Sequence, residues 1–153
     1  MKIEHTTDHS ILARLNEGVQ NLHHRLYPQD FKPFDLQQSR KAFEKILADP
    51  GVFAFLVVKN GKATGYILCM IKTRRESEFQ YAKTSLLVDQ VLVLDAYRKQ
   101  GVASALLEKV IALAHDKGIS DIELKHWEDN TAAAEFFLKK GFSYFNRKMK
   151  RTI

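Results

Sequence analysis

The sequence predicts a single α/β domain built around a mixed sheet, and three observations support this fold class. A chain of 153 residues is long enough to bury one sizeable core. Hydrophobic residues make up 45% and charged residues 27%, which is ordinary for a globular domain. Stretches with helical spacing of apolar residues alternate with short runs rich in Val, Ile and Leu. The resulting order of elements is β-α-α-β-β-β-α-β-α-β, and we treat residues 1–153 as one domain.

The first half of the chain is predicted to hold a strand, two helices and a hairpin. Residues 8–26 carry apolar side chains at helical spacing, and Pro28 ends that helix. The dipeptide Asn60-Gly61 between two apolar runs indicates a tight hairpin turn. The predicted ranges are a strand at 3–6, helices at 8–26 and 36–47, and strands at 52–59 and 63–74.

The second half repeats a strand-helix alternation. Apolar residues recur from Val102 to Ala114 at helical spacing, and Gly118 fits the C-terminal cap of that helix. The predicted ranges are a strand at 84–94, a helix at 101–117, a strand at 121–127, a helix from 129 or 130 to 141, and a strand-like segment at 143–153.

The net charge and its distribution narrow the classes of partner that the protein can bind. The net charge is +6, and one basic cluster lies near the C-terminus, at Arg147, Lys148, Lys150 and Arg151. Nucleic-acid binding is one consequence of such a cluster, but basic and acidic residues are mixed elsewhere and no nucleic-acid-binding module is evident. A solvated basic face, or attraction for a smaller polyanion, is the better interpretation. We therefore expect no nucleic-acid partner.

The compartment is predicted from the N-terminus, the apolar runs and the single cysteine. Residues 1–5 form no apolar segment of a signal peptide, and no run approaches the ~20 apolar residues of a membrane span. Cys69 lies in an apolar run and is expected to be a buried, inert thiol. We expect a cytoplasmic protein with no membrane partner.

A basic turn between a strand and a helix is the most informative feature. Residues 91–107 read as a buried strand, a turn that contains Gly101, and a helix. The N–H groups of such a turn and of a helix N-terminus attract phosphate, and the small Ala103 leaves room for it. The Walker pattern and the three-glycine dinucleotide pattern are both absent, which disfavours nucleotide hydrolysis and hydride transfer. The alternative is a plain strand-to-helix connection.

Two segments resemble the signatures of the GCN5-related N-acetyltransferase (GNAT) family. Residues 98–103, Arg-Lys-Gln-Gly-Val-Ala, resemble the pattern Gln/Arg-x-x-Gly-x-Gly/Ala, and residues 94–97 resemble its usual approach. The second segment is Ile122-x-Leu124-x-x-Trp127-x-x-Asn130-x-x-Ala133-x-x-Phe136-Phe137-x-x-x-Gly141-Phe142. The resemblance spans residues 84–145, and the N-terminal half matches in element order alone. It implies a GNAT-like mixed central sheet of six to seven strands flanked by four helices, with acetyl-CoA as cosubstrate and no metal.

The resemblance also implies a set of cofactor-binding residues. Amides of residues 99–104 would hold the pyrophosphate of acetyl-CoA, and residues 91–93 would pair with the pantetheine arm like an added strand. Where family members commonly carry a Tyr that protonates the departing thiolate, this chain has Phe137, so water, Tyr144 or Tyr97 is left for that role. The expected cofactor-binding residues are Val91, Leu92, Val93, Arg98, Lys99, Gln100, Gly101, Val102, Ala103, Ser104, Asn130 and Phe137.

Acetyl transfer to an amine needs a base close to the strand that holds the pantetheine arm. Asp89 is the first candidate, because it lies two residues before that strand, where relatives often carry Glu or Asp. The alternative is a carboxylate that attracts a cationic acceptor. His126 is the second candidate, with packing as its alternative role. We expect Glu123 and Lys125 to be mostly solvated on the opposite face of the strand from His126.

The acceptor site is expected between the first two helices and their loop, with His23, Tyr27 and Phe31 as substrate-binding residues. Two recognition modes stay open: an amine bound by Asp30, Glu78 or Asp89, or a carboxylate bound by Arg25, Arg74 or Arg75. The sequence thus predicts an N-acetyltransferase that moves an acetyl group to a primary amine of a small molecule or peptide by direct attack in a ternary complex. The alternatives are a non-catalytic acyl-CoA-binding module and a nucleic-acid-associated basic protein. The resemblance also implies a homodimer.

Overall fold

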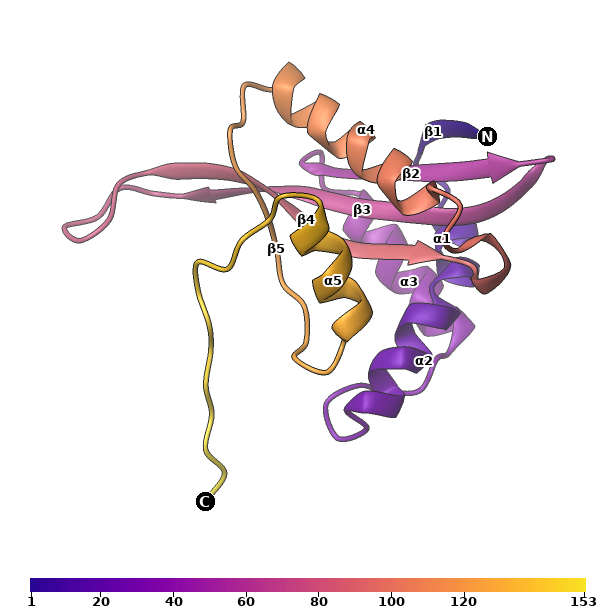
Figure 1. The fold of residues 1–153 in the computed structure, drawn as a ribbon, viewed down its shortest axis with the longest axis horizontal. Coiled ribbons are helices and arrows are strands. Elements are labelled where there is room, and N and C mark those ends of the chain that lie inside the picture. Colours follow the sequence, from indigo (N-terminus) through magenta and orange to yellow (C-terminus); the bar gives the residue numbers. More distant parts are fainter.

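The computed structural model describes residues 1–153 as one mixed sheet with helices on both faces (Figure 1). In chain order the elements are β1 (Lys2–Thr6), α1 (His9–Leu15), α2 (Glu17–Leu26), α3 (Leu36–Leu47), β2 (Val52–Lys59), β3 (Lys62–Arg74), β4 (Lys83–Val93), a 3₁₀ turn (Asp95–Tyr97), α4 (Val102–Asp116), β5 (Ile122–Leu124) and α5 (Thr131–Lys139). None of the helices is both long and apolar enough to cross a membrane.

The strands follow one another across the sheet in the order β1-β2-β3-β4-β5. All neighbours are antiparallel except β4 and β5, which run parallel. The β2–β3 hairpin closes at Asn60 and Gly61, whose φ angles of 52° and 72° are those a tight primed turn requires. The hairpin predicted from this dipeptide is confirmed.

Each face of the sheet buries its own apolar layer. Helices α4 and α5 cover one face, where Ile67, Leu86 and Leu106 are fully buried. Helices α1 and α3 cover the other face, where Leu12 is fully buried and the other core residues include Phe43 and Tyr66. Both layers form because alternate residues of a strand point to opposite faces.

Helix boundaries follow the capping residues. The Asp8 carboxylate accepts from two backbone N–H groups at the start of α1, and the Asp35 carboxylate accepts from Gln38 N at 2.8 Å at the start of α3. Gly118, with a φ of 65°, follows α4 as expected for a C-terminal cap. Cys69 is buried as predicted, and burial raises the pKa of its thiol to about 12.

The expected sheet of six to seven strands with four helices is wrong, since the structure has five strands in one sheet and five α-helices. The helix predicted at 8–26 is divided at Asn16, where the side chain turns inward to contact Tyr66 and Gln90. The strand predicted at 121–127 is restricted to the three residues that pair with β4. Residues 143–153 form no strand, because their backbone has no hydrogen-bonded neighbour within the chain.

Candidate functional site

The parallel strands β4 and β5, at one edge of the sheet, pair along only part of β4. They pair over residues 86–88 and 122–124, after which β5 ends while β4 continues to Val93. On the side away from β3, residues 89–93 therefore have no neighbouring strand. An extended ligand that contains amides can pair with the backbone groups exposed there.

The turn after β4 presents a row of unpaired backbone N–H groups. Lys99 and Gly101 have φ angles of 57° and 79°, both in the left-handed region. None of the six N–H groups from Lys99 to Ser104 donates to a protein acceptor, and Ala105 N is the first to bond, to Gly101 O at 3.0 Å. These groups lie at the positive end of α4. Such a turn is suited to bind an anion, phosphate above all.

The cations around this turn have different partners. Arg98 ion-pairs with Asp95 at 2.9 Å and donates to Val93 O at 3.1 Å, so its guanidinium stabilises the turn. Lys59, at the end of β2, donates to Gln100 Oε1 at 3.0 Å. Sequence reasoning missed Lys59, because the end of β2 comes next to the turn only through the arrangement of strands in the folded sheet.

Asp89 is the extra residue of a β-bulge. Leu68 pairs with Gln90 and Cys69 with Val88, so Asp89 has no partner on β3, and its side chain is exposed. The Gln90 amide donates to Asp89 Oδ2 at 3.4 Å. The bulge therefore places the carboxylate at the point where β4 loses β5 as its neighbour.

A buried polar network holds the side chain of Gln90. Its Oε1 accepts from the Tyr66 hydroxyl at 2.6 Å and from Asn16 Nδ2 at 3.3 Å. Burial raises the pKa of Tyr66 well above its usual value, so its hydroxyl stays a donor. Because Oε1 faces these donors, the amide nitrogen of Gln90 faces Asp89. Sequence reasoning missed this network.

His126 lies in the loop after β5 and not on a strand as predicted. Its Nδ1 is 3.0 Å from the Trp127 carbonyl oxygen, and its Nε2 is 2.9 Å from the Tyr144 hydroxyl. A carbonyl oxygen only accepts, so Nδ1 carries the proton, and in the neutral ring Nε2 accepts from Tyr144. No hydrogen bond joins His126 to Asp89.

The three residues predicted to bind substrate are brought together. The His23 and Phe31 rings stack at 4.7 Å, and Trp127 lies 4.6 Å from Tyr27 and 5.1 Å from Phe31. We call these four side chains the aromatic cluster. Burial lowers the pKa of His23 and favours its neutral form. Sequence reasoning did not include Trp127 in this group.

A hydrogen-bond pair secures the aromatic cluster. Tyr27 Oη donates to Asp129 Oδ2 at 2.7 Å and accepts from Asp129 N at 3.1 Å. The end of α2 is thereby joined to the loop between β5 and α5. The cluster therefore spans the side of the molecule on which β4 and β5 separate.

Two residues of the second signature have visible structural roles. Asn130 caps α5, since its Oδ1 accepts from Ala133 N at 3.3 Å. Phe137 is 8% exposed and packs edge-to-face on Phe136 and Phe142, at ring distances of 5.0 and 5.3 Å. These contacts account for their local geometry, and their contacts with CoA stay predictions.

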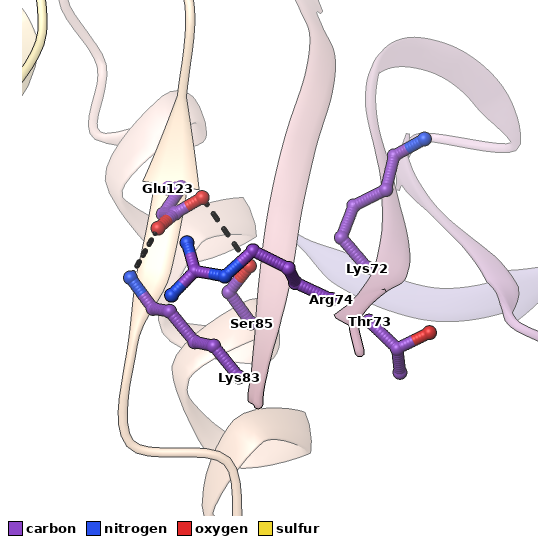
Figure 2. Close-up of a pocket in the computed structure, with 6 residues that line it drawn as sticks. All are labelled: Lys72, Thr73, Arg74, Lys83, Ser85 and Glu123. Carbon is purple, nitrogen blue, oxygen red and sulfur yellow. Dashed lines mark hydrogen bonds and ion pairs between the residues drawn. The ribbon is translucent and has the colours of Figure 1, made fainter. Parts of the chain in front are cut away.

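A polar hollow of about 140 Å³ lies at the start of β4, away from the basic turn (Figure 2). Lys83 ion-pairs there with Glu123 at 2.6 Å, which lowers the pKa of that carboxyl, and Ser85 Oγ donates to Glu123 at 3.3 Å. Glu123 is thus paired and half-buried, and not solvated as predicted. Arg74 donates to the Tyr81 carbonyl oxygen. Ten strand residues, roughly 30 Å, separate this hollow from the basic turn.

Comparisons with known proteins agree with this arrangement. The profile of the Acetyltransferase (GNAT) family matches residues 17–142. N-alpha-acetyltransferase 30 of Schizosaccharomyces pombe is 24% identical over 95 residues, which cover 62% of this chain and 60% of that protein. The chain therefore matches less than two thirds of the length of this relative.

Two solved structures share the fold. A tetramutant of the BH1408 protein from Bacillus halodurans has a TM-score of 0.92 at 17% identity, with 100% of both chains covered. The aminoglycoside N-acetyltransferase AAC(6')-Iy in complex with CoA has a TM-score of 0.72 at 18% identity, with 99% of this chain and 93% of that chain covered. Because the family profile matches most of the chain, including the basic turn and the separated strands, the chain belongs to the GNAT acetyltransferase family.

Proposed function

We propose that this protein transfers the acetyl group of acetyl-CoA to a primary amine of a small molecule or peptide, by direct attack in a ternary complex. One observation carries the proposal. Six unpaired N–H groups at residues 99–104 directly follow the part of β4 that has no neighbour on one side. A ligand with phosphates at one end and an amide-containing arm at the other satisfies both surfaces. CoA has this chemistry, and membership of the GNAT family supports the assignment.

The residues present fit CoA. The N–H groups of residues 99–104 would hold the pyrophosphate, with Lys59 and Lys99 as nearby cations. The backbone of residues 91–93 would pair with the pantetheine arm, while Asn130 and Phe137 are proposed contacts on the side of α5. When bound, acetyl-CoA supplies the thioester that donates the acetyl group.

Asp89 is the proposed base. Its exposed carboxylate, oriented by the Gln90 amide, takes the proton that the amine loses as a C–N bond forms and the C–S bond breaks. The departing thiolate needs a proton, which Phe137 does not have. The Tyr144 hydroxyl, hydrogen-bonded to His126, is the proposed donor on the chain.

The aromatic cluster is the proposed wall of the acceptor site. His23, Tyr27 and Phe31 come from α2 and the loop that follows it, and Trp127 comes from the loop after β5, with the carboxylate of Asp129 beside Tyr27. Aromatic rings next to carboxylates favour a cationic amine over an anionic acceptor. An aminoglycoside is the acceptor of one structural neighbour, so this class belongs in the test panel. We place the protein in the cytoplasm.

The first experiment separates binding from catalysis. Calorimetry with CoA and acetyl-CoA is expected to show saturable binding, and its absence would refute both CoA-dependent functions. Thiol release from acetyl-CoA is then measured with polyamines, amino acids, aminoglycosides and peptide N-termini. Saturable binding with no release above hydrolysis would favour the non-catalytic acyl-CoA-binding module, which the replacement of the usual Tyr by Phe137 also favours.

The Asp89→Asn variant tests the base. We expect turnover to fall at least ~100-fold, with CoA affinity retained, because the amide cannot accept the proton. Asp116→Asn is the matched control, since it removes one exposed carboxylate at the far end of α4. Equal turnover in the two variants would exclude Asp89 as the base.

A further inference from the structure

Three lysines at or near the basic turn have no acidic partner, and we call Lys59, Lys62 and Lys99 the lysine group. Lys59 and Lys62 flank the turn of the β2–β3 hairpin, and Lys99 belongs to the basic turn itself. None of the ion pairs in the structure includes a member of this group. The positive charges of the three side chains are therefore not neutralised within the chain.

The β2–β3 hairpin places two of these charges opposite each other. Lys59 and Lys62 are direct partners in the register of the two strands. Such partners project from the same face of a sheet, with Cα atoms about 4.5–5.5 Å apart. Like charges in directly opposed positions destabilise a strand pair. The end of this hairpin therefore has an arrangement that a bound dianion would stabilise.

The Lys59 side chain extends from the hairpin to the basic turn. Its ammonium donates to Gln100 Oε1 at 3.0 Å and lies 5.7 Å from the centre of the Tyr97 ring. Gln100 Nε2 donates to the Ala96 carbonyl oxygen at 3.0 Å, which turns Oε1 of the same amide toward the ammonium. A neutral amide and an aromatic ring thus hold the ammonium in place without neutralising it. Two of its three N–H donors are left for a ligand.

CoA has a third phosphate that the N–H groups of the turn do not account for. The N–H groups of residues 99–104 would hold the two phosphates of the pyrophosphate. The third phosphate is a monoester on the 3′-oxygen of the ribose, a few bonds from the pyrophosphate. A phosphate monoester carries a charge of about −1.5 to −2 at pH 7 and accepts hydrogen bonds on its free oxygens. A lysine ammonium is an ordinary ligand for such a group.

We propose that the lysine group binds the 3′-phosphate of CoA, with the Lys59 ammonium as its main ligand, so that the protein selects CoA over 3′-dephospho-CoA. The proposal rests on the proposed use of acetyl-CoA and adds which part of the cosubstrate the β2–β3 hairpin recognises. A monoester between Lys59 and Lys62 neutralises the opposed charges of the hairpin. It also accepts from the N–H donors of Lys59 that the Gln100 amide leaves free.

The test compares two ligands that differ in the 3′-phosphate alone. Calorimetry with the wild type is expected to show that CoA binds about 30-fold more tightly than 3′-dephospho-CoA, as hydrogen bonds between charged groups allow. Lys59→Met removes the ammonium and keeps an unbranched apolar stem. We expect its affinity for CoA to fall about tenfold and its affinity for 3′-dephospho-CoA to stay within about twofold of the wild type. Retained binding of 3′-dephospho-CoA also shows that the variant is folded.

Lys45→Met is the matched control. Lys45 is an exposed residue of α3, which covers the opposite face of the sheet from α4, and it forms no ion pair. The change lowers the net charge by the same amount as Lys59→Met, so it measures the general attraction of a basic protein for a polyanion. We expect less than about a twofold change in affinity for either ligand.

The pattern of affinities separates this proposal from the proposed function. Saturable binding of CoA and 3′-dephospho-CoA with equal affinity by the wild type would overturn the role of the lysine group and leave the use of CoA intact. Equal losses for the two ligands in Lys59→Met would also overturn it, since Lys59 would then contact a part that both ligands share. Absence of binding by both ligands would refute the use of CoA, and this proposal with it.

Discussion

Gly65 on β3 allows the close approach of the strand proposed to bind the pantetheine arm. A Cβ added at Gly65 would lie 2.6 Å from the Leu92 carbonyl oxygen and 3.3 Å from Val93 Cα. Carbon and oxygen atoms that are not bonded approach to about 3.3 Å, so Gly65→Ala requires the Leu92 carbonyl to move by about 0.7 Å. That atom belongs to the backbone of β4, so the strand itself must shift. We expect the free energy of unfolding to fall by about 1–3 kcal/mol.

Gly18→Ala is the matched control because it meets the same residue through a side chain. A Cβ at Gly18 would lie 3.0 Å from Leu92 Cδ1, the end of a side chain that can shift by a change of its torsion angles, and alanine favours the helix by up to about 1 kcal/mol. Urea denaturation measures the free energy of unfolding of both variants. Calorimetry measures their affinity for CoA, which we expect to fall about tenfold in Gly65→Ala and to stay unchanged in Gly18→Ala. A Gly65→Ala protein with wild-type stability and CoA affinity would refute this reasoning.

Two further predictions concern the polar groups of the sheet. Tyr66→Phe removes the 2.6 Å donor of Gln90, and urea denaturation should show a loss of about 1–3 kcal/mol; a loss below about 0.5 kcal/mol would contradict a structural role for the network. Glu123→Gln tests the pH dependence of stability. The pKa of Glu123 is lowered in the fold, so its ionised side chain adds to the free energy of unfolding above the ordinary pKa of 4.5. This contribution is lost as pH falls through the folded pKa. At pH 7 the free energy of unfolding of the wild type should exceed that of this variant by less than about 1 kcal/mol, and the denaturation curves of the two should converge in acid. A difference that stays constant with pH would contradict the ion pair with Lys83.

Elements that depend on neighbours in the chain were predictable. The hairpin at Asn60-Gly61, the helix that follows Gly101 and the cap at Gly118 each depend on backbone preferences within a few residues, and the structure has all three. The strand-turn-helix pattern around residues 91–107 also follows from local spacing. The sequence thereby located the stretch of chain that we propose for CoA binding before any tertiary contact was known.

Elements that depend on distant partners were not predictable. The division of the helix at Asn16 follows its contact with Gln90, 74 residues away, and the aromatic cluster is secured by Tyr27 and Asp129, 102 residues apart. The bulge at Asp89 exists only as a mismatch of register between two strands.

Residues 143–153 show most plainly the difference between what local sequence determines and what distant contacts determine. The sequence predicted a strand-like segment here, and the backbone is extended. A strand, however, is defined by hydrogen bonds to a neighbour, and the fold supplies none for this segment within one chain. The sequence by itself determined the local conformations and the basic turn. The tertiary structure decided which side chains meet and which backbone groups are left without partners, because those depend on contacts between residues far apart in the chain.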